Sequence, residues 1–181
     1  MRKIVSSFFL SLDGVMESPE KWHFPYFDDE MGEAIGAALA STDAMLMGRV
    51  NYVEWAAYWP TSTDQPIADF FNNVPKYVVS TTLQSAEWNN STLISANVAE
   101  EIAKLKEQPG GNIGMSGSAT LVEWLLHEGL LDELRLMVHP IVVGSGRRLF
   151  ESGKGPKPME LVESKTLGTG VLDLTYRPAD K

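Results

Sequence analysis

Short apolar runs alternate with amphipathic stretches along most of the chain. The runs resemble buried strands in length and in their β-branched and aromatic content, and they predict strands at 3–11, 43–48, 75–81, 92–95, 112–115 and 132–144. The stretches between them repeat apolar residues three and four positions apart, which predicts helices at 31–41, 49–59, 97–108 and 118–129. We expect 61–75 to be mainly connection, with one helical turn.

The last part of the chain has a different pattern. Residues 159–178 alternate apolar and polar positions on both sides of Gly168-Thr169-Gly170, which is typical of an antiparallel hairpin. Strands alternating with helices, followed by a strand pair, predict an α/β fold with a largely parallel sheet and an antiparallel edge. In such folds ligands bind at the carboxyl ends of the strands.

Composition narrows the class of protein. The 181 residues are 44% hydrophobic, enough for one core, and we expect 1–181 to form a single domain. The chain has no cysteine, which excludes disulfides, thiolate metal sites and a cysteine nucleophile. The segment MRKIVSSFFLSLDG reads as a strand rather than a signal peptide, because serines interrupt its apolar run. No segment approaches 18 uninterrupted apolar residues, so we expect no membrane partner and a cytoplasmic location.

The charge of the chain restricts its partners. Fifteen basic and 24 acidic residues give a net charge of −9. A charge of this sign repels polyphosphate backbones, so the sequence disfavours nucleic acid as a partner. A small anionic ligand would have to be held by local basic groups or by backbone N–H groups.

Small and hydrogen-bonding residues follow four of the predicted strands, at Asp13-Gly14, Gly48-Arg49, Ser80-Thr81 and Ser116-Gly117-Ser118. The last of these lies in the glycine-rich stretch GNIGMSGSAT, just before a helix whose first N–H groups lack partners within the helix. This arrangement suits a phosphate, which the positive end of the helix dipole also favours. It equally suits a tight turn in which one of the serines is only a helix cap.

Arg49 adds an independent signal. A cation in the first turn of a helix faces the positive end of the dipole, at a cost of roughly 0.3–1 kcal/mol unless an anion lies nearby. Two interpretations remain open: Arg49 faces an anionic ligand, or it pairs with one of the many carboxylates of this chain.

Four segments, in order, resemble the dihydrofolate-reductase-like family: SLDG at 11–14, LMGRVNYVEW at 46–55, VVST at 78–81 and MSGSATLVEWLLHEGLLDELRLMVHPIVVGSGRRLF at 115–150. The chain is most similar to the branch that contains the riboflavin-biosynthesis reductase domain and bacterial reductase-like proteins. The resemblance covers nearly the whole chain. It implies a three-layer α/β fold with a mostly parallel central sheet, flanking helices and an antiparallel C-terminal hairpin at the edge, and it implies an NADPH-dependent reductase.

The resemblance also implies which residues hold NADPH. Gly48, Arg49 and Asn51 match the loop and helix start that grip the cofactor phosphates, with Arg49 facing the 2′-phosphate. The other matching positions are the second loop on that phosphate, the helix start beneath the pyrophosphate and the edge of the nicotinamide pocket: Ser80 and Thr81; Ser116, Gly117, Ser118, Ala119 and Thr120; and Asp13 with Gly14. Ser116-Gly117 stands where the family has a glycine pair, and the resemblance implies a cis peptide bond between them.

The expected substrate is a small, flat heterocycle, similar to a pterin or a riboflavin precursor, whose C=N or C=O bond accepts hydride. Four aromatic residues are the candidates for its pocket: Trp22, Phe27, Tyr52 and Trp55. The candidate proton carriers are Asp13 and, because dihydrofolate reductase has a carboxylate on its first helix, Asp28 with its neighbours Asp29 and Glu30.

The basic cluster Arg147, Arg148, Lys154 and Lys157 stands out on an acidic chain. It is a solvated turn, a contact in the homodimer that we expect, or a clamp for a phosphorylated substrate.

Two other functions remain open. The stretch GMSGS lies between a strand and a helix, as the nucleophile of a serine hydrolase does, but Ser118 replaces the final glycine of that motif and only His127 and His139 follow as bases. A nucleotide-binding protein without turnover would keep the same groove. Metal catalysis is not expected, because the three histidines show no ligand spacing.

Overall fold

The computed structural model describes residues 1–151 and 155–179. Its strands are β1 (Ile4–Leu10), β2 (Thr42–Gly48), β3 (Lys76–Val79), β4 (Ser91–Ile94), β5 (Asn112–Ser116), β6 (Glu133–Val138), β7 (Met159–Thr166) and β8 (Leu172–Pro178). Its helices are α1 (Asp29–Ala40), α2 (Arg49–Tyr58), α3 (Ile67–Asn73), α4 (Val98–Glu107) and α5 (Ala119–His127), with short 3-10 turns at Pro19–Lys21, Phe24–Tyr26 and Trp59–Thr61.

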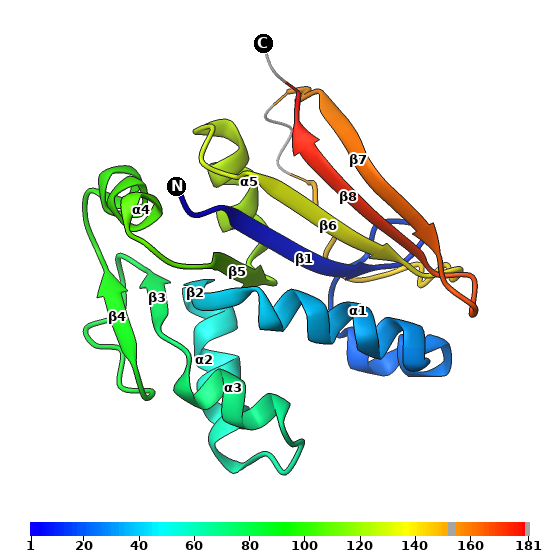
Figure 1. Cartoon of the computed structure of the whole chain (residues 1–181), viewed down its shortest axis with the longest axis horizontal. Helices are drawn as coiled ribbons and strands as arrows, with labels where there is room; N and C mark the ends of the chain where they lie inside the picture. Colours follow the sequence, from blue (N-terminus) through cyan, green and yellow to red (C-terminus); the bar gives the residue numbers. More distant parts are fainter. Residues whose placement is uncertain (152–154, 180–181) are drawn as a thin grey trace.

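All eight described strands form one sheet, in the order β4-β3-β2-β5-β1-β6-β8-β7. The six strands from β4 to β6 run parallel, whereas β8 is antiparallel to both β6 and β7. The C-terminal hairpin therefore extends one edge of a parallel sheet, as the alternating pattern of residues 159–178 predicts (Figure 1). The predicted fold class is confirmed.

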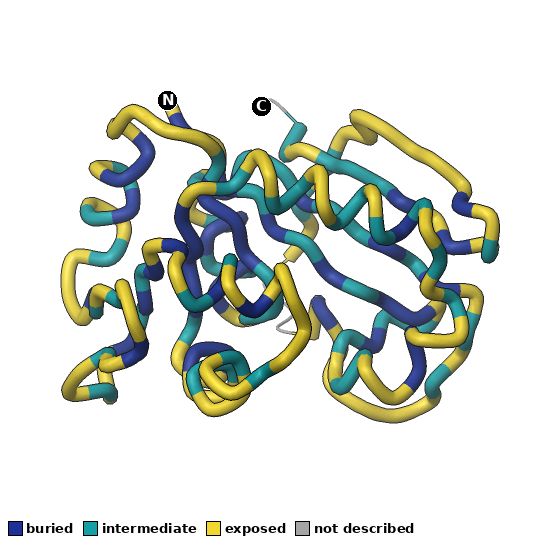
Figure 2. Tube along the Cα trace, turned by 60° about the horizontal axis from the view of Figure 1, so that its bottom comes forward, coloured by how far each residue is buried: buried dark blue, intermediate teal, exposed yellow. Residues whose placement is uncertain are grey.

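Helices cover both faces of the sheet, which gives three layers (Figure 1). On one face, Ile102 of α4 and Leu125 of α5 pack with Ile4 and Phe8 of β1. On the other face, Met31 of α1 packs with Met137 of β6, and α2 and α3 cover β2 and β3. Figure 2 shows the result, with buried residues along the central strands and exposed residues on the outer sides of the helices. The central strands are apolar on both sides because both sides are covered.

Two predicted elements differ from the structure. The strand expected over 132–144 ends at Val138, because Pro140 has no N–H to continue the ladder, and the chain leaves the sheet there. The segment expected to hold one helical turn contains the seven-residue helix α3.

Asp28 caps α1 with its side chain, whereas α4 begins without such a cap. Asn97 occupies the N-cap of α4, but its backbone is left-handed and its side chain makes no capping bond. In the described residues no helix is long and apolar enough to cross a membrane.

Candidate functional site

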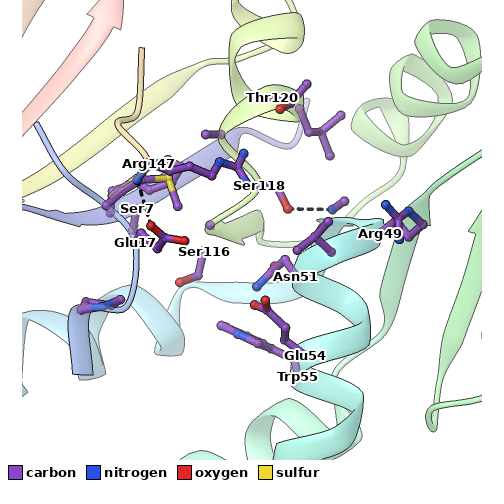
Figure 3. A pocket seen from close by; sticks show the side chains of 18 of the residues that line it. Ser7, Glu17, Arg49, Asn51, Glu54, Trp55, Ser116, Ser118, Thr120 and Arg147 are labelled. Carbon is purple, nitrogen blue, oxygen red and sulfur yellow. Dashed lines mark hydrogen bonds between the residues drawn. The ribbon is translucent and has the colours of Figure 1, made fainter. Parts of the chain in front are cut away.

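A groove of about 890 Å³ opens where β1, β2 and β5 end. Its walls are the segment after β1 (16–20), the start of α2 (Gly48–Trp55), the β5–α5 loop with the first turn of α5 (Ser116–Leu121), and Arg147. Figure 3 shows the labelled side chains of these segments facing a common space. The volume is at the upper end of the range for small-molecule sites, so the groove has room for a ligand larger than a simple metabolite.

Two residues of the β5–α5 loop have the left-handed backbone conformation, which few residue types adopt readily. Gly117 has φ +83°, and a Cβ atom on it would lie 3.3 Å from Nδ2 of Asn51. The next residue, Ser118, is also left-handed, with φ +62°. The glycine is therefore required by the close approach of Asn51 from α2.

Ser118 stands at the N-cap of α5 without capping it. Its Oγ instead accepts a hydrogen bond of 2.8 Å from the N–H of Gly48, the last residue of β2 and the N-cap of α2 (Figure 3). A Cβ atom on Gly48 would lie 3.0 Å from that oxygen. The end of β2 and the β5–α5 loop are thus bonded to each other, and the first turn of α5 is left open toward the groove.

Arg49 lies in the wall of the groove, on α2. Within the described residues no carboxylate lies within 4.0 Å of its guanidinium, whereas Arg2, Arg135, Arg148 and Arg177 each have one. Pairing of Arg49 with a protein carboxylate, one of the two interpretations of the sequence, is therefore absent among the described residues. A cation without a protein counter-ion remains beside the helix starts, where a bound anion would be stabilised.

Asn51 supplies a further polar group. The residue is 9% exposed, and its Oδ1 is buried without a hydrogen-bond partner. A buried carbonyl oxygen without a donor is costly, so the site is complete only when a ligand or a water donates to it.

The structure brings most of the predicted cofactor residues to the groove: Gly48, Arg49, Asn51, Ser116, Gly117, Ser118, Ala119 and Thr120 all line it. Gly14, Ser80 and Thr81 do not. The Ser80 hydroxyl accepts from the N–H groups of Thr82 and Leu83 and so shapes its own turn, while the neighbouring Val79 reaches the groove. The position expected for a second phosphate loop is therefore occupied by a self-contained turn.

Asp13 is held by the protein itself, away from the groove. Its carboxylate accepts hydrogen bonds from the hydroxyl of Ser11 (2.6 Å) and from the N–H groups of Gly144 (2.9 Å) and Val143 (3.1 Å). These bonds, that of Ser11 first, lower its pKa to about 2. The carboxylate is thus bonded to protein groups and lies outside the groove wall, so the geometry does not support contact between Asp13 and a ligand in the groove.

Asp28 is also engaged elsewhere. It is the N-cap of α1, and its Oδ1 accepts a 2.8 Å bond from the N–H of Met31. It is not part of the groove wall. The carboxylates that do line the groove are Glu17, Glu20 and Glu54.

Of the four aromatic candidates, only Trp55 lines the groove. Trp22 is buried and donates its indole N–H to the carbonyl of Glu17, and Phe27 is half exposed beside α1. Tyr52 is buried on the other side of α2, where its hydroxyl accepts from the N–H of Trp88. These three residues therefore lie outside the groove, and only Trp55 is in a position to contact a ligand there.

The sequence did not indicate several groove residues, among them Ser7, Phe9, Met16, Glu17 and Glu54. It did single out Arg147, as a member of the basic cluster for which a substrate clamp was one interpretation. Lys157 of that cluster does not line the groove, and Lys154 lies outside the described residues. Glu54 carried a usable signal, because it lies three residues after Asn51 and so shares its helix face. Ser7 had none, because it meets the groove through pairing with Ser116 across more than a hundred residues of chain.

Two other expectations can be assessed from the described residues. Among the described residues the cis peptide bond is Gln65–Pro66, and the bond between Ser116 and Gly117 is trans. The prediction of a cis bond at Ser116–Gly117 is therefore wrong. His139, a possible base for a serine nucleophile, is fully buried among aromatic rings and does not line the groove. No cluster of three potential metal ligands occurs in the described part of the chain.

Comparison with known proteins agrees with this architecture. The family model of the RibD C-terminal domain matches residues 2–172. The uncharacterized protein YyaP of Bacillus subtilis is 31% identical over 180 residues, covering 97% of this chain and 94% of YyaP.

Two solved structures share the fold. A pyrimidine reductase-like protein from Corynebacterium diphtheriae superposes with a TM-score of 0.69 at 12% identity, over 99% of this chain and 93% of that one. Dihydrofolate reductase from Enterococcus faecalis, complexed with NADP(H), superposes with a TM-score of 0.64 at 15% identity, over 98% and 97% of the two chains.

Proposed function

This chain belongs to the RibD C-terminal domain family, and from that premise we propose that it is an NADPH-dependent reductase. Its substrate is a small, flat heterocycle, similar to a pterin or a riboflavin precursor, with a C=N or C=O bond that accepts hydride. The names of the two structural neighbours, one reductase-like and one complexed with NADP(H), support the same reaction class.

The observation that carries the proposal is the arginine in the groove wall. Arg49 has no protein counter-ion in the described residues, stands at the start of α2, and shares the groove with the open first turn of α5. A dinucleotide with a pyrophosphate and a 2′-phosphate fits these groups, with the 2′-phosphate on Arg49 and the pyrophosphate at the N–H groups of α5. The buried Oδ1 of Asn51 would accept from a hydroxyl or amide of the same ligand.

The other end of the groove would hold the substrate against Trp55 and Phe9. The bound cofactor would supply the hydride, and the reduced atom would then need a proton. Among the groove carboxylates, Glu17 is tied to the backbone N–H of Arg147, whereas Glu54 extends from α2 next to Trp55 (Figure 3). We assign proton delivery to Glu54 in place of Asp13 and Asp28.

The test is the melting temperature of the purified protein with NADPH and with NADH. A ligand at about 100 times its dissociation constant adds about 2.7 kcal/mol to the free energy of unfolding, which is readily measured. Arg49→Gln should lower the affinity for NADPH by about tenfold or more and the affinity for NADH much less, because only NADPH offers the 2′-phosphate. Arg177→Gln removes the same charge on β8, outside the groove, and is the control. If neither nucleotide raises the melting temperature, the proposal fails.

A binding protein without turnover is the second candidate, favoured by the position of both predicted proton carriers outside the groove. An assay of NADPH oxidation separates the reductase from the binding protein. The absorbance of NADPH is recorded in the presence of pterin, flavin-precursor and carbonyl compounds. Nucleotide binding with no oxidation across that panel supports the binding protein.

A further inference from the structure

A cluster of aromatic and imidazole rings joins the groove to the segment between β1 and α1. The ring of His23 stacks on Phe9 of β1, with the centroids 4.7 Å and the planes 13° apart. His139, which directly follows β6, meets Phe9 and Trp22 edge-on at centroid distances of 5.5 and 5.2 Å. Phe9 itself lines the groove, so the packing of this cluster affects the shape of the site.

One wall of the groove, residues 16–20, continues directly into this cluster. The hydrogen bonds at the next residues are local. The indole of Trp22 donates to the carbonyl of Glu17 at 3.1 Å, and the N–H of His23 donates to the carbonyl of Pro19 at 2.8 Å. The contacts of these two residues with the sheet are made by their rings, which therefore hold this part of the chain in place.

Two ring nitrogens of the cluster are buried without a hydrogen-bond partner. His139 is fully buried, and its Nδ1 donates to the carbonyl of Met137 at 2.9 Å, which leaves Nε2 as a bare acceptor. His23 is 7% exposed, and its Nδ1 is also unpartnered. A neutral imidazole has one nitrogen without a proton, whereas an imidazolium carries N–H groups on both. Protonation of either ring would thus bury a charged donor that has no acceptor, which is costly.

The surroundings offer little to stabilise such a charge. Glu20 is the carboxylate that acts on His23, and His139 acts on it as a second potential cation. The ring of Tyr26 lies 5.7 Å from His139. The other elements packed here contribute apolar side chains: Met31, Met137, Leu167 and Val171. Burial therefore lowers the pKa of both histidines, and for His23 the effect of Glu20 opposes it.

We propose that His23 and His139 form a pH-sensitive latch, in which protonation of His23 releases residues 18–25 from the sheet and opens this wall of the groove. His23 is the ring that leaves, because the N–H of His139 is bonded to the carbonyl of Leu10 in β1 at 2.7 Å. The released segment binds a proton more readily than the packed one, so release is favoured as the pH falls below about 6.5. A ligand that contacts residues 16–20 is then held less tightly, whatever its identity.

Hydrogen exchange of the nucleotide-free protein tests the latch. Exchange is followed by mass spectrometry at about pH 7.5 and about pH 5.5, and each rate is corrected for the intrinsic pH dependence of exchange. The protection of residues 18–25 should fall by about tenfold or more at the lower pH, which is the cost of one buried N–H without an acceptor. The protection of α4, on the other face of the sheet, should stay the same.

Three variants separate titration from packing. His23→Phe keeps a ring on Phe9 but takes up no proton, so residues 18–25 should stay protected at the lower pH. His23→Gln loses the stacking as well, and its segment should exchange rapidly at both pH values. His127→Gln changes a histidine of α5 outside the cluster and should respond as the wild type does.

The inference is overturned if residues 18–25 of the wild type are equally protected at both pH values, or if His23→Phe keeps the wild-type response. A loss of protection that extends equally to α4 also contradicts it, because the whole molecule then unfolds rather than one wall. No nucleotide is present in this measurement, so its outcome is independent of whether NADPH binds.

Discussion

At the scale of single residues, Ser118 explains why the loop before α5 consists of small residues. Its hydroxyl bonds the N–H of Gly48, 70 residues earlier in the chain, and Gly117 beside it makes room for Asn51. The small residues are therefore needed for the fold itself, because they allow the end of β2 and the β5–α5 loop to approach each other. The opening that remains is what a phosphate would use.

We expect Ser118→Ala to lower the free energy of unfolding by about 0.5–1.5 kcal/mol, because the Gly48 N–H loses its acceptor. NADPH affinity should fall as well, since the two loops are no longer joined. Urea denaturation with and without NADPH measures both effects. Ser116→Ala is the matched control for the stability measurement, because the acceptor for the Gly48 N–H is Ser118 rather than Ser116. Equal stability of the two variants would contradict the bridging role.

Site residues could be predicted from the sequence where they lie together in one short segment. The start of α2 and the start of α5 could be predicted as parts of one site, because each has its small residues directly after a strand. The surroundings of Asp13 could not be predicted, for the opposite reason. One of its partners is Gly144, 131 residues away, and only the folded chain shows that this carboxylate is already engaged.

At the scale of elements, α1 shows how a capping residue resembles a catalytic one. Asp28 precedes the helix, as a functional carboxylate of the first helix would, but its oxygen is bonded to the N–H of Met31. Helix existence could be predicted from the 3.6-residue repeat. The end of β6 could not be placed as well, since the apolar pattern continues to Gly144 although the chain leaves the sheet before Pro140.

Asp28→Ala should reduce the free energy of unfolding by about 1 kcal/mol, the usual cost of losing an N-cap, and leave NADPH binding unchanged. Thermal and urea unfolding test the first part, and nucleotide titration tests the second. Asp29→Ala, one position later and inside the first turn, is the control. A selective loss of turnover in Asp28→Ala, with stability preserved, would return Asp28 to a catalytic role.

At the scale of the whole molecule, the order of the strands decides where the site lies. β1 occupies the centre because it pairs with β5 on one side and β6 on the other, through partners such as Ile4 with Ile113 and Val5 with Glu133. Hydrophobic periodicity predicts that such strands exist and are buried on both faces. It carries no information on which strands are neighbours, and this is why Ser7, which reaches the groove through the pairing of β1 with β5, could not be assigned to the groove in advance.

Stability of the whole molecule should fall as the pH drops below about 6.5. The rings of His23 and His139 lie 6.1 Å apart in an aromatic cluster with Phe9, and burial lowers the pKa of both. Below about pH 6.5 the unfolded chain takes up protons that the folded chain resists, so unfolding becomes easier. His23→Phe keeps the stacking on Phe9, removes one titrating group, and should flatten the decline in melting temperature between about pH 7 and pH 5.

His127→Gln, in the last turn of α5 and outside this cluster, is the control for that measurement. An identical pH dependence in His23→Phe and the wild type would show that acid destabilisation arises elsewhere.

The central place of β1 also has a consequence for biosynthesis. When the first strand leaves the ribosome, neither of its neighbours has been translated, and the last of them is complete only at Val138. The pairings that close the sheet span more than a hundred residues, and such long-range closure is slow and entropically costly. The groove itself is built from segments distributed along the chain, from Ser7 to Arg147. Until β6 has been translated, the apolar residues of β1 therefore lack part of their packing, and the nascent chain is more prone to aggregate than the finished protein.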